Sequence, residues 1–203
     1  MTKRKKVMDV VFLLDRSGSM KGTEKDTIGG YNSYINSFKN ENAKITTILF
    51  DNKYEMITER KDVKEVSELT EKEYYVRGST ALLDAIGNSI KFMDDKKADK
   101  VMFIITTDGY ENASHNYAKE QIKEMIQGHS NWEFMYIGAD IDSYSEGNSI
   151  GIKSSNIANY KKDSKGISKM FRAISIASKN YCEENYVKSS WKNDLENYIN
   201  ENK

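Results

Sequence analysis

Apolar and polar positions follow two alternating patterns along this chain. Short runs of apolar or β-favouring residues predict strands at residues 10–14, 44–50, 101–106 and 132–137. Helical spacing of apolar residues predicts helices at residues 23–40, 82–93, 117–127 and from 166 onward, with a short helix at 141–147. Thr23 and Asp26 predict an imperfect capping box at the start of the first helix.

The predicted order of elements indicates the fold class. A turn at residues 51–52 leads into a further strand at 54–58, which predicts a hairpin. Residues 62–75 are charged and weakly periodic, and residues 152–158 predict a weaker last strand. Because strands otherwise alternate with helices and the central strands are apolar throughout, we expect an α/β fold. Its sheet is doubly wound and mostly parallel, with helices on both faces and one antiparallel edge strand.

Three segments at strand ends or a helix start are rich in oxygen ligands: residues 15–19, 78–80 and 107–109. An extended backbone would point the alternating side chains of Asp15, Ser17 and Ser19 to one side. Doubly wound sheets bind ligands at the carboxyl ends of their strands, so Thr80 and Asp108 would complete the set. Hydroxyl and carboxylate oxygens suit Mg²⁺. The first segment alone is equally well read as a polar turn and helix N-cap.

Together these residues resemble the metal-ion-dependent adhesion site (MIDAS) of the von Willebrand factor A (vWA) domain family. The family pattern is Asp-x-Ser-x-Ser after the first strand, a Thr in a later loop and an Asp after the fourth strand. The matching residues are Asp15, Ser17, Ser19, Thr80 and Asp108. The resemblance covers roughly residues 7–185 and implies a Rossmann-like sheet of about six strands.

The resemblance also implies how Mg²⁺, or alternatively Mn²⁺ or Ca²⁺, would be held. Ser17 and Ser19 would bind the ion directly, Thr80 directly or through water, and Asp15 and Asp108 largely through water. An inner shell of neutral oxygens leaves the ion positively charged at its exposed face. An Asp or Glu of a partner protein would then supply the last ligand. We therefore expect a metal-dependent protein-interaction module in an intracellular assembly, with an AAA+ ATPase or another complex subunit as a candidate partner.

Two alternative functions stay open at this point. One is a metal-dependent phosphoester hydrolase that uses Asp15 and Asp108, and the other is a vWA domain whose metal is purely structural. We expect no catalytic residues, because the sequence has no Gly-Lys-Ser/Thr phosphate loop. Its two histidines, His115 and His129, fall in a predicted loop and just after a predicted helix end.

Composition limits the possible partners and the compartment. Lys plus Arg and Asp plus Glu both number 31, so the formal net charge is zero, and no global field attracts nucleic acid or acidic membranes. The basic residues 1–6 are not followed by the apolar region of a signal peptide, so we expect no signal peptide and no membrane span. The single Cys182 lies on a predicted apolar helix face, which favours core packing. These features predict a cytoplasmic protein.

The chain divides into an expected vWA domain, residues 1–187, and a C-terminal tail, residues 188–203. Helical spacing in the tail, which includes Trp191, predicts a helix that docks on the domain or in a groove of a partner, and we expect docking on the domain.

Polar residues beside the predicted ligands have two interpretations. Arg16 is either a contact to an acidic partner or, as is more common, a solvated or locally paired arginine. Tyr110, Glu111, Asn112 and His115 either set partner specificity or form an ordinary polar loop. Arg77 and Asp140, near other element ends, have weaker claims to a functional role.

Overall fold

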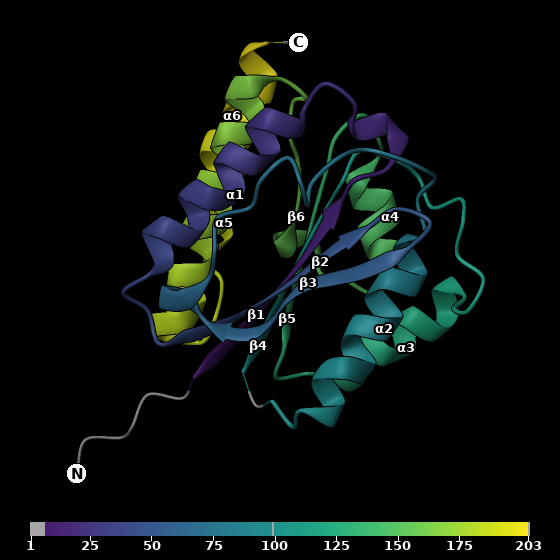
Figure 1. The fold of residues 1–203 in the computed structure, drawn as a ribbon, viewed down its shortest axis with the longest axis vertical. Helices are drawn as coiled ribbons and strands as arrows, with labels where there is room; N and C mark the ends of the chain where they lie inside the picture. The colour runs from purple at the N-terminus through teal and green to yellow at the C-terminus, as the bar shows by residue number, and fades with distance from the viewer. Residues whose placement is uncertain (1–6, 99, 203) are drawn as a thin grey trace.

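A computed structural model describes residues 7–98 and 100–202 of the chain (Figure 1). The basic residues 1–6 lie outside the described residues. The strands are β1 (Met8–Asp15), β2 (Ala43–Phe50), β3 (Tyr54–Asp62), β4 (Val101–Thr107), β5 (Glu133–Gly138) and β6 (Ile157–Asn159).

These strands form one sheet in the order β3-β2-β1-β4-β5-β6. Every neighbouring pair is parallel except β2 and β3, which are antiparallel. The predicted fold class is therefore confirmed, including its antiparallel edge strand. The chain winds outward from β1 in one direction and from β4 in the other, so the strand order reverses between these two strands. Loops that follow β1 and β4 accordingly meet at one edge of the sheet.

Helices cover both faces of the sheet (Figure 1). They are α1 (Glu24–Phe38), α2 (Leu82–Asp95), α3 (Lys119–Gly128), α4 (Ser143–Ser149), α5 (Ser164–Glu184) and α6 (Asn193–Glu201). Residues of α1, α5 and α6 pack in one apolar cluster, and residues of α2 and α3 pack in the other. Alternate residues of β1 belong to different clusters: Phe12 faces the first, and Val11 and Leu13 face the second. Burial on both faces explains why β1 is apolar throughout.

The structure differs from the predicted elements at several ends. Strand β3 runs to Asp62, beyond the predicted end at residue 58. The sequence did not reveal this extension because the added residues are polar and partly exposed on the sheet edge, so they show no apolar pattern. Strand β6 has only three residues, fewer than residues 152–158 suggested. Thr23 does precede α1, but the predicted capping box is wrong: its hydroxyl donates a hydrogen bond to the Met20 carbonyl at 2.6 Å.

The tail predicted at residues 188–203 docks on the domain through its described residues, which end at 202. A short 3₁₀ helix, Ser189–Lys192, leads into α6. Trp191 is 1% exposed and packs in the α1/α5 cluster, and its Nε1 donates to the Ser155 carbonyl at 2.9 Å. Cys182 of α5 is buried in the same cluster, as its apolar helix face predicted.

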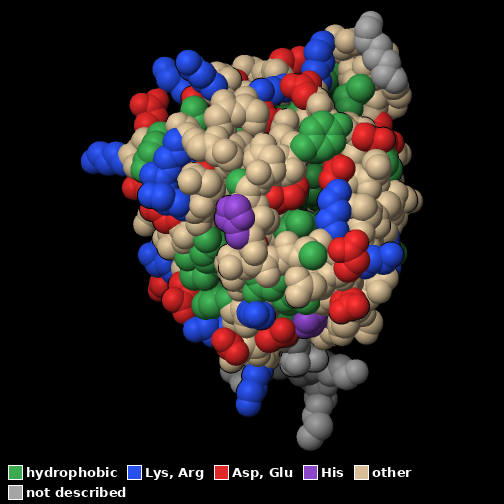
Figure 2. Space-filling model, turned by 90° about the vertical axis from the view of Figure 1, so that its right-hand side faces the viewer, with side chains coloured by type: hydrophobic (Ala, Val, Ile, Leu, Met, Phe, Trp, Pro, Cys, Tyr) green, Lys and Arg blue, Asp and Glu red, His purple; other side chains and the backbone are tan. Residues whose placement is uncertain are grey.

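Charged side chains of both signs are interspersed over the face that Figure 2 shows, as expected from a zero net charge. Across the described part of the chain, no helix has the length and apolar character needed to cross a membrane.

Adjacent glycines of α1 should respond oppositely to substitution. A Cβ at Gly30 would lie 2.1 Å from the Phe171 ring of α5, whereas a Cβ at Gly29 would meet nothing within 4 Å. Gly30→Ala should lower the free energy of unfolding by about 1–3 kcal/mol through overpacking. Gly29→Ala should raise it by about 0.5–1 kcal/mol, because alanine favours the helix. Urea unfolding of both variants measures this, and equal effects would contradict the packing of α1 on α5.

Candidate metal centre

Asp15 ends β1 and is completely buried. Its Oδ1 accepts a hydrogen bond from the Ser17 backbone N–H at 2.7 Å, which closes a tight turn after the strand. Its Oδ2 accepts a hydrogen bond from the Thr107 hydroxyl at 2.6 Å. Because Thr107 is the last residue of β4, this carboxylate connects the carboxyl ends of the two central strands.

The alternating serines after Asp15 point toward β4. The hydroxyl oxygens of Ser17 and Ser19 lie 3.0 Å apart, and the Ser19 hydroxyl donates to Asp108 Oδ1 at 2.5 Å. Ser17 and Asp108 are buried, whereas Ser19 is exposed. The cluster therefore has a buried base and an open outer side.

Thr80 reaches the same place from the loop before α2. A Cβ at Gly109 would lie 3.1 Å from the Thr80 hydroxyl oxygen and 3.2 Å from the Ser19 hydroxyl oxygen. Both hydroxyls therefore border the same small space, and glycine is the residue type that leaves it open. The structure brings together all five residues predicted from the sequence.

The chemistry of this donor set fits a hard divalent cation. Three hydroxyls and two carboxylates offer only oxygen atoms, which Mg²⁺ and Mn²⁺ prefer. Within the described residues, no group of three or more His, Cys, Asp or Glu side chains could hold a metal ion. The cluster differs from such groups because most of its donors are neutral. That these residues bind metal stays a prediction.

Burial controls the protonation of Asp15. It raises the pKa of this carboxyl group from 3.8 to about 6, although hydrogen bonds from Thr107 and Ser17 work in the opposite direction. A divalent cation nearby would favour the ionised form and lower this pKa.

Asn112 holds Thr80 through two hydrogen bonds to the Thr80 backbone. Its side-chain oxygen accepts from the Thr80 N–H at 2.9 Å, and its own N–H donates to the Thr80 carbonyl at 3.0 Å. Glu111 similarly accepts from the Leu83 N–H at 2.9 Å in the first turn of α2. These two residues position the loop, a role that their place in the sequence did not reveal. Tyr110 is 53% exposed and is thus accessible to a partner.

Arg16 is buried, so its interpretation as a solvated arginine or a contact to an external partner is wrong. Its Nε donates to Asp51 at 2.9 Å and its Nη2 to Glu55 at 2.5 Å. The other suggestion, a locally paired arginine, is confirmed. Arg77 also donates to Asp51, at 2.8 Å. Asp51 and Glu55 thereby compensate the buried guanidinium charge of Arg16, and Arg77 connects Asp51 to the segment that precedes Thr80.

Gly78 brings that loop against the serine segment. Its carbonyl accepts a hydrogen bond from the Gly18 N–H at 3.0 Å. Its φ angle is +70°, and a Cβ there would lie 2.3 Å from the Asn52 side-chain oxygen. Any other residue type would therefore be strained and would displace Asn52.

Lys162 is the functional candidate that the sequence patterns missed. Its ammonium lies 2.6 Å from Asp108 Oδ2 and donates to the Ser19 carbonyl at 2.5 Å. It belongs to the loop between β6 and α5, and no motif connects it to the other residues.

Two other polar features lie outside the predicted ligand cluster. Residues 147–151 read Gly-x-Ser-x-Gly, a pattern found around some hydrolase nucleophiles. Here the segment begins within α4 rather than following a strand, and the Ser149 hydroxyl donates to the Glu146 carbonyl at 2.7 Å. Asp140, after β5, is exposed and borders a shallow cavity with Tyr110.

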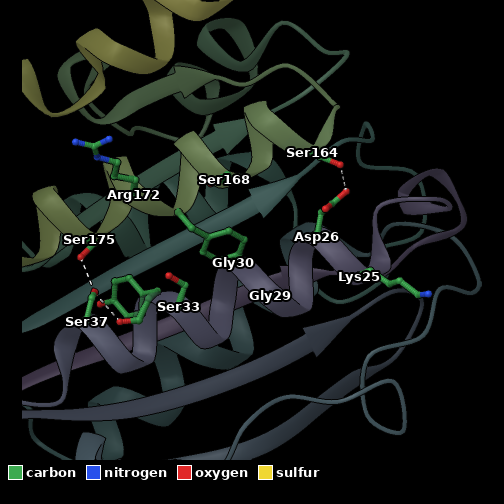
Figure 3. A pocket seen from close by; sticks show the side chains of 12 residues that line it. Lys25, Asp26, Gly29, Gly30, Ser33, Ser37, Ser164, Ser168, Arg172 and Ser175 are labelled. Carbon is green, nitrogen blue, oxygen red and sulfur yellow. Dashed lines mark hydrogen bonds between the residues drawn. The ribbon is translucent and has the colours of Figure 1, made fainter.

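A cavity of about 440 Å³ lies between α1 and α5, away from the predicted ligands (Figure 3). Small residues such as Gly29, Ser33 and Ser168 line it. Polar contacts bridge the two helices, including Ser37 with Ser175 at 2.8 Å. The cavity follows from packing small residues between two helices.

A six-stranded, mostly parallel sheet with hydroxyl and carboxylate side chains at the ends of its central strands defines a Rossmann-like domain with a candidate metal centre. The chain belongs to the von Willebrand factor type A domain family, whose model matches residues 9–196. Domains of this family are typically metal-dependent protein-interaction modules. The match extends past residue 187, where the domain was predicted to end.

Solved structures share the fold at low sequence identity. Proximal thread matrix protein 1 from the mussel byssus, with a zinc-occupied MIDAS motif, has a TM-score of 0.65 and 16% identity over 88% of this chain. The manganese-loaded TRAP protein of Plasmodium vivax has a TM-score of 0.60 and 21% identity, over 82% of this chain and 73% of that chain. The pilus adhesin SpaC of Lactobacillus rhamnosus GG has a TM-score of 0.70 and 12% identity, over 85% of this chain and 30% of that chain.

This chain covers 46% of the mussel protein. No curated protein matches the sequence.

Asp15 should make stability depend on pH in the presence of EDTA. Its raised pKa means that the folded state holds the proton more tightly than the unfolded chain. The resulting stabilisation is complete below pH 3.8 and is lost as the pH rises through about 6. Between these limits the wild type should lose about 2–3 kcal/mol of unfolding free energy relative to Asp15→Asn. Urea unfolding at a series of pH values measures the difference, and parallel curves would contradict this role of Asp15.

Proposed function

We propose that this chain is a Mg²⁺-dependent protein-interaction module that binds an acidic side chain of a partner protein. The main support for this proposal is the cluster of three hydroxyls and two carboxylates near the ends of β1 and β4, which is buried at its base and open at Ser19. The hydroxyls of Ser17, Ser19 and Thr80 would hold the ion, and Asp15 and Asp108 would act largely through water.

The donor chemistry supports binding of an external carboxylate. Neutral hydroxyls leave the charge of a divalent ion poorly compensated, so the bound ion would attract an Asp or Glu side chain from outside. Metals named in the related structures, zinc in the mussel protein and manganese in the Plasmodium protein, support divalent binding in general. We propose Mg²⁺ as the natural ion, with Mn²⁺ or Ca²⁺ as possible substitutes.

Composition supports the proposed setting. Zero net charge and a single buried cysteine favour a cytoplasmic module in an intracellular assembly, without nucleic acid or membrane binding. A subunit of a larger complex, such as an AAA+ ATPase, is the proposed partner. The family analogy alone suggests that particular partner.

The alternative functions have less support. A phosphoester hydrolase would use Asp15 as a catalytic group, but this carboxylate is completely buried and both of its oxygens accept hydrogen bonds within the protein. We therefore propose that the protein is not an enzyme. A purely structural metal is less favoured because Ser19, a proposed direct ligand, is exposed.

Metal binding should depend on the serine hydroxyls. Ser17→Ala removes one proposed direct ligand and should weaken Mn²⁺ binding by about tenfold or more. Ser175→Ala, which removes a serine hydroxyl between α1 and α5, should leave it unchanged. Isothermal titration of Mn²⁺ and Mg²⁺ into each protein measures the affinity. Equal binding by the two variants would reject this metal site.

Partner binding should require the metal. Immobilised wild-type protein should retain its partner in Mg²⁺ and release it in EDTA, because the proposed contact is a carboxylate bound to the ion. Ser17→Ala should retain little partner, and Ser175→Ala should behave as wild type. Mass spectrometry of the eluates measures retention. Binding that persists in EDTA would favour a structural metal, and metal-dependent hydrolysis of a generic phosphoester would favour the enzyme.

A further inference from the structure

Lys162 places a positive charge inside the candidate metal centre. Its ammonium lies 2.6 Å from Asp108 Oδ2, while the other oxygen of that carboxylate accepts from Ser19. The Asp108 side chain is fully buried, and the Lys162 side chain is 23% exposed. The pair is therefore shielded from solvent much more than an ordinary surface salt bridge, and its electrostatic energy is correspondingly larger.

The backbone on both sides of Lys162 is anchored. Before it, the Tyr160 N–H donates to the Gly138 carbonyl at the end of β5 at 2.8 Å. After it, the Asp163 side chain accepts from the Gly166 N–H at 2.7 Å and caps α5. The neighbouring Lys161 pairs with Asp163 at 3.7 Å instead of with a predicted ligand. Of these two adjacent lysines, only Lys162 is directed to Asp108 and Ser19.

We propose that Lys162 is a tethered cation that competes with the divalent ion for Asp108 and so weakens metal binding. This inference rests on the proposed function of the same site. A divalent ion held by Ser17 and Ser19 would lie close to the ammonium that contacts Asp108 and the Ser19 carbonyl, and the two cations repel each other. Metal binding must therefore overcome both this repulsion and the loss of the Lys162–Asp108 ion pair.

Competition of this kind would give the module a threshold. At low metal concentration the ammonium neutralises Asp108, and the site has no ion to offer a partner. At higher concentration the metal displaces the ammonium, which then lies free beside the exposed Ser19, where a partner carboxylate would approach. Lys162 would thus set the metal concentration at which partner binding begins.

If the Lys162–Asp108 ion pair is purely structural, a different change in metal affinity is expected. If Lys162 only connects the β6–α5 loop to β4, its removal should loosen Asp108 and leave metal affinity unchanged or lower. Metal affinity therefore distinguishes the two roles.

Titration of Mn²⁺ into Lys162→Met tests the proposal, with Lys161→Met as the matched control. Lys162→Met should bind Mn²⁺ at least about tenfold more tightly than wild type, because it removes a nearby positive charge. Lys161→Met should stay within about twofold of wild type. Unchanged or weaker binding by Lys162→Met would overturn the competition.

Thermal unfolding provides a second measurement on the same proteins. In EDTA, Lys162→Met should melt below wild type, because Asp108 loses its counter-charge. Saturating Mn²⁺ should raise its melting temperature by more than that of wild type, because tighter binding stabilises the folded state more. An equal rise in both proteins would count against the proposal. Lys162→Gln, which also removes the charge, should give the same results and replaces Lys162→Met should that variant fail to fold.

The outcomes separate this inference from the proposed function. If wild type binds Mn²⁺ and Lys162→Met binds it equally, only the competition is rejected. If neither wild type nor the Lys162 variants bind metal, the metal-dependent function is rejected together with it.

Discussion

The parallel pairing of β1 with both β2 and β4 is the constraint on which the rest of the structure depends. Leu14 of β1 lies opposite Leu49 of β2 and Thr106 of β4, so the three strands end at the same level. The loops that follow them must therefore share one edge of the sheet. Apolar packing on both faces holds β1 in place, while its last residue, Asp15, is a carboxylate that would be costly to bury unless it were hydrogen-bonded. Thr107 and the Ser17 amide meet that need and thereby connect two of the loops.

The three acidic residues at this edge of the sheet differ in the groups that compensate their buried charge. Asp51 accepts from the two guanidinium groups of Arg16 and Arg77, which keeps the loop before Thr80 in place. Asp108 is paired with the ammonium of Lys162. Asp15, among the described residues, has hydrogen bonds but no ion-pair partner, and burial accordingly raises its pKa to about 6. The neutral hydroxyls of the predicted ligand set therefore gather beside a carboxylate that no cation of the described residues compensates.

Most of the fold could be predicted because both faces of the central strands are buried and each helix turns one apolar face to the sheet. The sequence was less informative about the end of the edge strand β3 and about the burial of Arg16. The outer part of β3 has polar residues on an edge and shows no apolar alternation, so its end at Asp62 was missed. For Arg16 the sequence allowed a paired arginine but revealed neither its burial nor its two carboxylate partners, Asp51 and Glu55, which lie 35 and 39 residues away in sequence. Neither a period nor a motif can report such a pairing.

The sequence by itself determined the candidate ligands of this protein. The strand before Asp15, the alternation of Asp15 with two serines, and the positions of Thr80 and Asp108 after other elements together predicted one oxygen-rich cluster, because strand period and parallel winding are local or topological properties. Only the tertiary structure decided what surrounds that cluster. It pairs the ammonium of Lys162 with Asp108 and brings the side-chain oxygen of Asn112 to the Thr80 N–H. Both contacts join loops that are distant in sequence. Such contacts depend on where whole elements pack, and electrostatic attraction then selects among the charges that packing brings within reach.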